Sequence, residues 1–192
     1  MLFFPELGQF GEEFKRWQLN VRMSARIRNQ RTLEQDGYIF SAATREDLKS
    51  IDQLHILLFR QPMVRWIRYV YKVRPNQLIG VVKNAQGQLV GYDCFMFNEV
   101  EVADRIIHEQ YVAIAPQFQG QGLSTKLRRY SISCYDEGFI TGVSTLAGEH
   151  DIKALRSAQK SGYAIVKMSA KPPAYYLYQS LHARYPNSPN QS

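Results

Sequence analysis

The two glycines in residues 117–122, Gln-Phe-Gln-Gly-Gln-Gly, have a spacing that can hold an anion through the backbone. The preceding residues 111–116 are apolar and end in Pro116, which is typical of a buried strand. Residues 123–137 favour a helix that stops at Gly138. A strand, a glycine turn and a helix start together direct unpaired N–H groups and the positive end of a helix dipole at one point. A phosphate or pyrophosphate is therefore the expected occupant.

This glycine pattern matches neither of two common nucleotide-binding motifs. A Walker loop needs a Gly-Lys-Ser/Thr ending, which is missing here. A dinucleotide fingerprint needs a third glycine at the position where this chain has Thr125. Two glycines alone are also compatible with a purely structural turn. The flanking strand and helix favour the anion site.

A second segment with chemically active side chains follows a predicted strand over residues 140–146. His150 comes just after that strand, and residues 151–160 favour a helix that Gly162 closes. Asp151 stands where a helix N-cap would lie, so capping is one interpretation of its role. His150 is a candidate acid, base or acceptor ligand.

These segments resemble the Gcn5-related N-acetyltransferase (GNAT) superfamily. The acyl-CoA motif of that family is Gln/Arg-x-x-Gly-x-Gly/Ala, after a strand that ends in proline. It is similar to Val112-x-Ile114-x-Pro116-Gln117-x-x-Gly120-x-Gly122. The family's second motif, Asn-x-x-Ala-x-x-x-Tyr-x-x-x-Gly-Phe, is similar to the segment that has Asp151, Ala154, Gly162 and Tyr163 in register. The resemblance covers residues 38–170.

The resemblance implies an α/β (α+β) GNAT fold, with a central mixed, mostly antiparallel twisted sheet of six to seven strands flanked by helices. It implies an N-acyltransferase that moves an acetyl or longer acyl group from acyl-CoA to a primary amine, by direct attack in a ternary complex, without a metal. An alternative keeps the fold as a non-catalytic module that binds acyl-CoA or a peptide. The residues that the resemblance assigns to acyl-CoA binding are Val112, Ala113, Ile114, Gln117, Phe118, Gln119, Gly120, Gln121, Gly122, Leu123, Ser124 and Asp151.

Two neighbouring side chains are candidates for the general base. Strand alternation predicts His108 and Val112 on one face and Glu109 and Tyr111 on the other. The resemblance implies a base on this strand, a few residues before Ile114, and this register favours His108. The ordinary pKa of histidine suits proton abstraction near neutrality. Glu109 would serve only if a β-bulge rotated the strand.

The chain departs from the family pattern at Ala158. Many GNAT proteins have a tyrosine there that acts as general acid, so no side chain is assigned to protonate the leaving thiolate. Solvent or another residue would then supply the proton. The smaller side chain also predicts more room beside the thioester, and therefore an acyl chain longer than acetyl.

The predicted organisation is one acyltransferase domain with additions at both ends. Residues 1–37 form a basic, amphipathic helical extension, residues 38–185 the GNAT domain, and residues 186–192 a disordered tail. The extension is open to three interpretations: a helix packed on the domain, an arm that binds the acceptor or dimerises, or a helix on a membrane surface. Residues 78–82 and 89–97 predict a hairpin before the acyl-CoA strand.

Composition sets wider limits on class and partners. The chain has 192 residues, 45% of them hydrophobic, which fits one domain, and its net charge of +7 exceeds what coenzyme A alone would explain. Cys94 and Cys134 are far apart in sequence and lack metal-ligand spacing, so neither a disulfide framework nor a zinc site is expected. Reduced cytoplasm is therefore the default compartment. No apolar run is long enough to span a membrane, and no helix-turn-helix or RNA-binding aromatic motif predicts a nucleic-acid partner. The expected partners are the acyl-CoA donor and an amine acceptor, a small molecule or peptide, with a homodimer left open.

Overall fold

The computed structural model describes residues 6–28, 30–136, 138–170 and 173–181. In this part of the chain, eight strands form one sheet in the order β1-β2-β3-β4-β5-β6-β8-β7. The strands are β1 (Leu33–Gln35), β2 (Tyr38–Ala42), β3 (Ile79–Asn84), β4 (Leu89–Met96), β5 (Ile106–Ile114), β6 (Gly142–Gly148), β7 (Ala164–Ala170) and β8 (Pro173–Ser180). The helices are α1 (Glu6–Ser24), α2 (Asp47–Phe59), α3 (Arg65–Val73), α4 (Pro75–Leu78), α5 (Leu123–Tyr135) and α6 (Ile152–Ser161), with the short 3-10 turns η1 (Val102–Asp104) and η2 (Pro116–Phe118).

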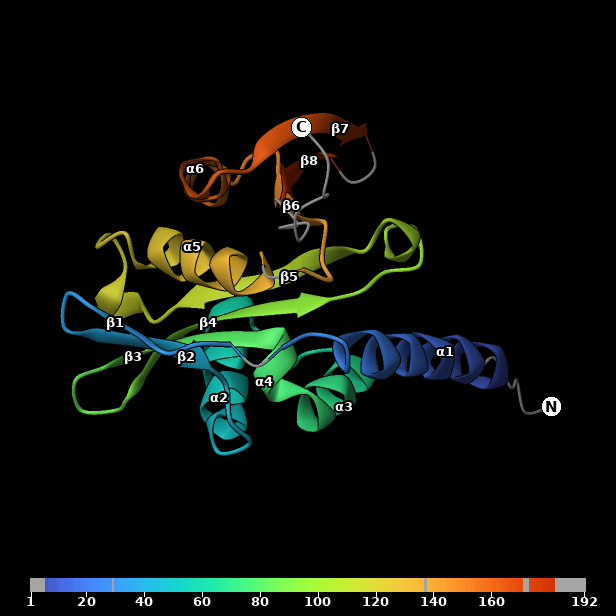
Figure 1. Cartoon of the computed structure of the whole chain (residues 1–192), viewed down its shortest axis with the longest axis horizontal. Coiled ribbons are helices and arrows are strands. Elements are labelled where there is room, and N and C mark those ends of the chain that lie inside the picture. Colours follow the sequence, from blue (N-terminus) through green and yellow to red (C-terminus); the bar gives the residue numbers. More distant parts are fainter. Residues whose placement is uncertain (1–5, 29, 137, 171–172, 182–192) are drawn as a thin grey trace, which may run out of the picture.

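Helices cover both faces of the sheet. Helices α2, α3 and α4 lie on one side, α5 lies on the other, and α6 lies beside β6, β7 and β8 (Figure 1). The pairing is antiparallel throughout except between β5 and β6, which run parallel. This mixed, mostly antiparallel α/β arrangement confirms the expected fold class.

The sheet has more strands than the expected six to seven, and one of the additional strands is β1. It arises from residues assigned above to the helical extension. Asp36 and Gly37 have φ angles of 53° and 77°, and Gln35 pairs with Tyr38 directly across them. Positive φ at both central residues defines a two-residue hairpin turn, for which Asp-Gly is a favoured sequence. The Asp36-Gly37 pair in the sequence therefore indicated a hairpin. The helix of the extension ends at Ser24, before this hairpin begins.

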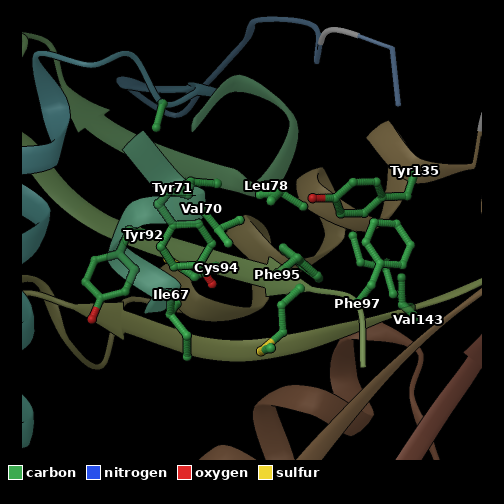
Figure 2. Packing of buried hydrophobic residues seen from close by; sticks show 14 of the residues in the cluster. Ile67, Val70, Tyr71, Leu78, Tyr92, Cys94, Phe95, Phe97, Tyr135 and Val143 are labelled. Carbon is green, nitrogen blue, oxygen red and sulfur yellow. The ribbon is translucent and has the colours of Figure 1, made fainter. Parts of the chain in front are cut away.

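The core is built on β4, which is covered on both faces. Figure 2 shows Tyr92 and Cys94 next to Tyr71 of α3, while Phe95 turns toward Tyr135 of α5. The rings of Phe95 and Tyr135 are 4.8 Å apart between centroids. A strand buried on both faces has a nearly continuous apolar sequence, as residues 89–97 do.

Helix α1 is attached to the sheet by a buried amide side chain. Asn20 accepts a hydrogen bond from the Phe97 N–H at 2.7 Å and donates one to the Phe97 carbonyl at 2.9 Å. The N-terminal end of α1 projects away from the sheet (Figure 1). None of the described helices is both long and apolar enough to cross a bilayer. The tail predicted over residues 186–192 lies outside the described residues.

Candidate functional site

Strands β5 and β6 pair along only part of their length. Their parallel register runs from Ile106 opposite Gly142 to Glu109 opposite Thr145. Beyond this point, within the part of the chain that the structure describes, β5 pairs only with β4, and β6 pairs only with β8. The two strands therefore part, and their free edges over residues 110–114 and 146–148 form the sides of an opening in the sheet.

A bulge in β5 decides which side chains lie on each side of this opening. The register of β5 against β4 skips Gln110. Because paired residues share a face, His108 and Tyr111 lie on the α2 side of the sheet, and Glu109 and Val112 lie on the α5 side. The alternation that grouped His108 with Val112 is therefore wrong: one extra residue reverses the faces beyond it.

The backbone edge of β5 faces the opening. The Ala115 N–H donates to the Val90 carbonyl of β4 at 2.8 Å. Antiparallel strands alternate the direction of their peptide groups, so those of Val112 and Ile114 point away from β4. The Gln119 side chain already donates to the Ile114 carbonyl at 2.9 Å. This edge can pair with an extended ligand in the manner of an added strand.

The glycine turn lies between the end of β5 and the start of α5. Gly120 and Gly122 have φ angles of 80° and 74°, and the space that a Cβ would occupy is open at both. The Lys126 N–H donates to the Gly122 carbonyl at 3.1 Å, so the N–H groups of Leu123 and Ser124 precede the first helical bond. A helix start that no described side chain caps, beside two open glycine positions, fits the predicted anion site.

Two aromatic residues support this turn from the side. The Tyr38 hydroxyl donates to the Gln121 side chain at 3.0 Å, and the Tyr38 ring meets Phe118 edge-on with centroids 6.5 Å apart. Gln117 is exposed on η2. Sequence reasoning missed Tyr38, since only the folded sheet brings it beside the turn.

On the α2 side, His108 belongs to a polar cluster drawn from four elements. Its Nδ1 lies 2.8 Å from Ser144 Oγ and 3.5 Å from Glu101 Oε2, and Tyr176 donates to Glu101. Burial alone would raise the pKa of Glu101, but hydrogen bonds from His108, Ser144 and Tyr176 lower it to about 2. Glu101 is therefore a carboxylate that orients the imidazole. Sequence reasoning missed Glu101, Ser144 and Tyr176, because no motif joins them.

On the α5 side, Glu109 is part of a buried ion pair. Its carboxylate lies 2.7 Å from an Arg128 nitrogen and also accepts hydrogen bonds from Thr145 at 3.2 Å and Tyr163 at 3.3 Å. Asp93 is buried nearby, and its pKa is raised by burial and then by the Glu109 charge. The Glu109 carboxylate is therefore occupied by protein groups.

The second segment lies at the end of β6. His150 is exposed in the turn before α6. Asp151 accepts a hydrogen bond from the Ala154 N–H at 2.9 Å, which makes it the N-cap of α6. Ala158 is fully buried within α6. The structure brings the glycine turn and the β5 edge together, and separates His108 from Glu109 by the sheet.

No protein-family model and no curated protein sequence matches the chain. Solved structures do match. Ard1 from Thermoplasma volcanium has a TM-score of 0.62 and 16% identity, covering 76% of this chain and 98% of that one. Spermidine N-acetyltransferase from Vibrio cholerae has a TM-score of 0.58 and 19% identity, covering 77% and 95%. Arabidopsis thaliana Naa50, in complex with the bisubstrate analogue CoA-Ac-MVNAL, has a TM-score of 0.61 and 12% identity, covering 75% and 99%. The chain therefore has the fold of the GNAT acetyltransferases, as its motifs predicted.

Proposed function

We propose that the protein is an N-acyltransferase that moves an acetyl or longer acyl group from acyl-CoA to a primary amine. The observation that carries this proposal is the meeting of two backbone features at one opening. The helix start after Gly122, which no described side chain caps, suits a pyrophosphate. The edge of β5 at Val112 and Ile114 has no neighbouring strand on that side, and it suits an extended amide-containing arm that would pair with it beside the Gln119 contact. Coenzyme A has both parts. The similar structures include acetyltransferases named for spermidine, which is an amine.

The transfer step needs a polarised carbonyl and a proton acceptor. The amine nitrogen attacks the thioester carbon, and an N–H of the β5 edge stabilises the oxygen as it becomes negative. The C–N bond forms, the C–S bond breaks, and coenzyme A leaves as a thiolate. The amine proton passes to a general base, and solvent at the exposed rim protonates the thiolate.

His108 is the base that the geometry favours. Its Nδ1 faces Ser144 and Glu101, which leaves Nε2 to accept the amine proton. The nearby Glu101 carboxylate would stabilise the imidazolium that forms. Glu109 is less suited, because Arg128 binds its carboxylate. His150, exposed at the end of β6, is proposed as an acceptor ligand at the rim.

The length of the acyl group depends on the space near Ala158. This residue is fully buried and belongs to the core cluster that includes Tyr163. Packing has thus closed around the smaller side chain, which supports acetyl as the preferred donor. A longer acyl group would require this packing to open. Comparing kcat/KM for acetyl-CoA and octanoyl-CoA tests which of the two is the preferred donor.

Thiol release from acetyl-CoA, measured with a panel of polyamines, amino acids and peptides, tests the function. We expect release with at least one amine, and a loss of about 10²- to 10⁴-fold in kcat for His108→Gln. Thermal stabilisation by coenzyme A should be unchanged in that variant, because His108 lies on the other side of the sheet from α5. Stabilisation by coenzyme A without thiol release for any amine would favour the non-catalytic module.

A further inference from the structure

The excess positive charge of the chain is confined to two segments. Residues 6–31 and 60–74 contain eleven of the 24 Lys and Arg residues but three of the 17 Asp and Glu residues. The remainder of the chain has 13 basic and 14 acidic residues, so it is nearly neutral. The segment 60–74 has five basic residues and no acid. The proposed coenzyme A site is at α5, outside both segments.

The fold brings these two segments together, because α1 packs against α3. We call this surface the α1/α3 face. Between the helices is a hollow of about 430 Å³, which is lined mainly by aromatic side chains. The lining residues are Phe10, Glu13, Phe14, Trp17, Arg65, Trp66, Tyr69, Lys72 and Val73. Phe10 is 68% exposed and Phe14 49%.

Arg65 and Lys72 are the two cations that line this hollow, together with one acid, Glu13. Within the described residues, no carboxylate lies within ion-pair distance of Arg65 or Lys72. Both lie instead over the Tyr69 ring, at 5.8 Å and 5.5 Å from its centroid. Their charges therefore remain available to an anionic partner.

A second hollow of about 600 Å³ adjoins the first at Trp17. Its charged lining residues are Lys15, Arg22 and Arg74. The Nε atom of Arg74 is buried and has no hydrogen-bond partner among the described residues. An apolar hollow and a basic hollow thus share Trp17 as a wall. Together they would suit an amphiphile that has an apolar part and an anionic head.

We propose that the α1/α3 face docks the protein on lipid bilayers that contain anionic phospholipid. Exposed Phe10, Phe14, Tyr69 and Val73 would enter the interfacial region while the surrounding Lys and Arg side chains meet the headgroups. The projecting N-terminal end of α1 can approach a flat surface without obstruction by the sheet (Figure 1). This inference does not depend on the proposed transferase activity.

Charge and apolar exposure together favour a bilayer over two other occupants. A second copy of this chain would bring two strongly basic faces together, which like-charge repulsion opposes. Nucleic acid would satisfy the charges but would leave the aliphatic part of the face, such as Val73, without an apolar partner. A bilayer that contains anionic lipid offers a partner both to the basic side chains and to the apolar ones.

Flotation of the full chain with two kinds of vesicle tests the proposal. Vesicles of phosphatidylcholine alone should not retain the protein, and vesicles that also contain phosphatidylglycerol should. Arg65→Gln with Lys72→Gln should weaken binding by about thirtyfold, and Phe10→Ser with Phe14→Ser by at least about tenfold. Circular dichroism and thermal unfolding would verify that each variant is folded.

Matched variants on other surfaces act as controls. Arg45→Gln with Lys49→Gln removes the same charge from exposed positions near the start of α2, and Ile165→Ser with Val166→Ser removes exposed apolar groups from β7. Both should bind vesicles like the unaltered protein. The proposal is overturned if the unaltered protein fails to float with anionic vesicles, or if the control variants lose as much binding as the test variants. RNA binding that the phenylalanine variant leaves intact, or a dimer that this variant dissociates, would overturn it in favour of those partners.

Discussion

Glu109 and Arg128 form a buried ion pair at the level where β5 and β6 part. The pair joins β5 to α5, and a further Arg128 nitrogen donates to the Ala154 carbonyl of α6 at 3.3 Å. One guanidinium thus ties together three elements that surround the opening. Its pKa is raised above the ordinary arginine value, because the Glu109 charge and hydrogen bonds outweigh the effect of burial. Arg128 is therefore charged, and its contacts connect these three elements.

Removing one partner of this pair should be strongly destabilising. Arg128→Met leaves the Glu109 carboxylate buried without a counter-charge, and we expect a loss of about 3–5 kcal/mol in the free energy of unfolding by urea. The double variant with Glu109→Gln should recover part of that loss. Lys126→Met is the control on the same helix: its ion pair with Asp36 is largely exposed and should contribute less than about 1 kcal/mol. Equal effects of the two single variants would contradict this assignment.

Gly122 should affect the binding of acyl-CoA in addition to the stability of the fold. Gly122→Ala forces a left-handed conformation on alanine, at about 1–2 kcal/mol, and puts a methyl group into the open space above the helix start. Gly87→Ala, in the β3–β4 hairpin, has the same φ of 74° and the same open space. Both should lower Tm, but only Gly122→Ala should raise the KM for acetyl-CoA.

That pair of variants can separate a ligand cradle from a structural turn. If Gly122→Ala and Gly87→Ala leave the KM equally unchanged while lowering Tm alike, the glycine turn has a structural role only.

The glycine turn and the helix start that follows it were predictable because their signals are local. A strand ending at Pro116, a glycine turn and a helix start succeed one another in sequence, and their backbone groups need no distant partner. The helix cap at Asp151 was likewise an interpretation open from the sequence, and the structure confirms it. Residues that are neighbours in sequence form these features, and their backbone groups supply most of the contacts.

The polar cluster around His108 was less predictable because distant residues form it. Glu101, Ser144 and Tyr176 meet His108 through the β5–β6–β8 pairing, and no spacing in the chain indicates this. The bulge at Gln110 has no residue signature either, yet it alone reverses the faces of the strand beyond it. The resemblance allowed for a bulge in this strand. Assigning each side chain to a face of the sheet also required the pairing register of β5 with β4.

The Glu101 carboxylate should give the protein a specific acid sensitivity. Its pKa in the folded chain is about 2, below the ordinary 4.5, so its contribution to stability is complete above pH 4.5 and is lost as the pH falls toward 2. Allowing for solvent screening, we expect about 1–2 kcal/mol. Urea unfolding between pH 7 and pH 2 should show this loss in the unaltered protein relative to Glu101→Gln. Parallel pH curves for the two proteins would contradict the assignment.

Asn20 should control how firmly α1 is held to the domain. Asn20→Ala leaves the Phe97 N–H and carbonyl without their side-chain partner in a buried position, for an expected cost of about 2–3 kcal/mol. Gln18→Ala, at an exposed position of the same helix, should cost little. Limited proteolysis gives a local measure, because a loosened α1 would be cut faster in Asn20→Ala while the sheet stays intact. If the two variants are cut at the same rate, the Asn20 contact does not fix the helix.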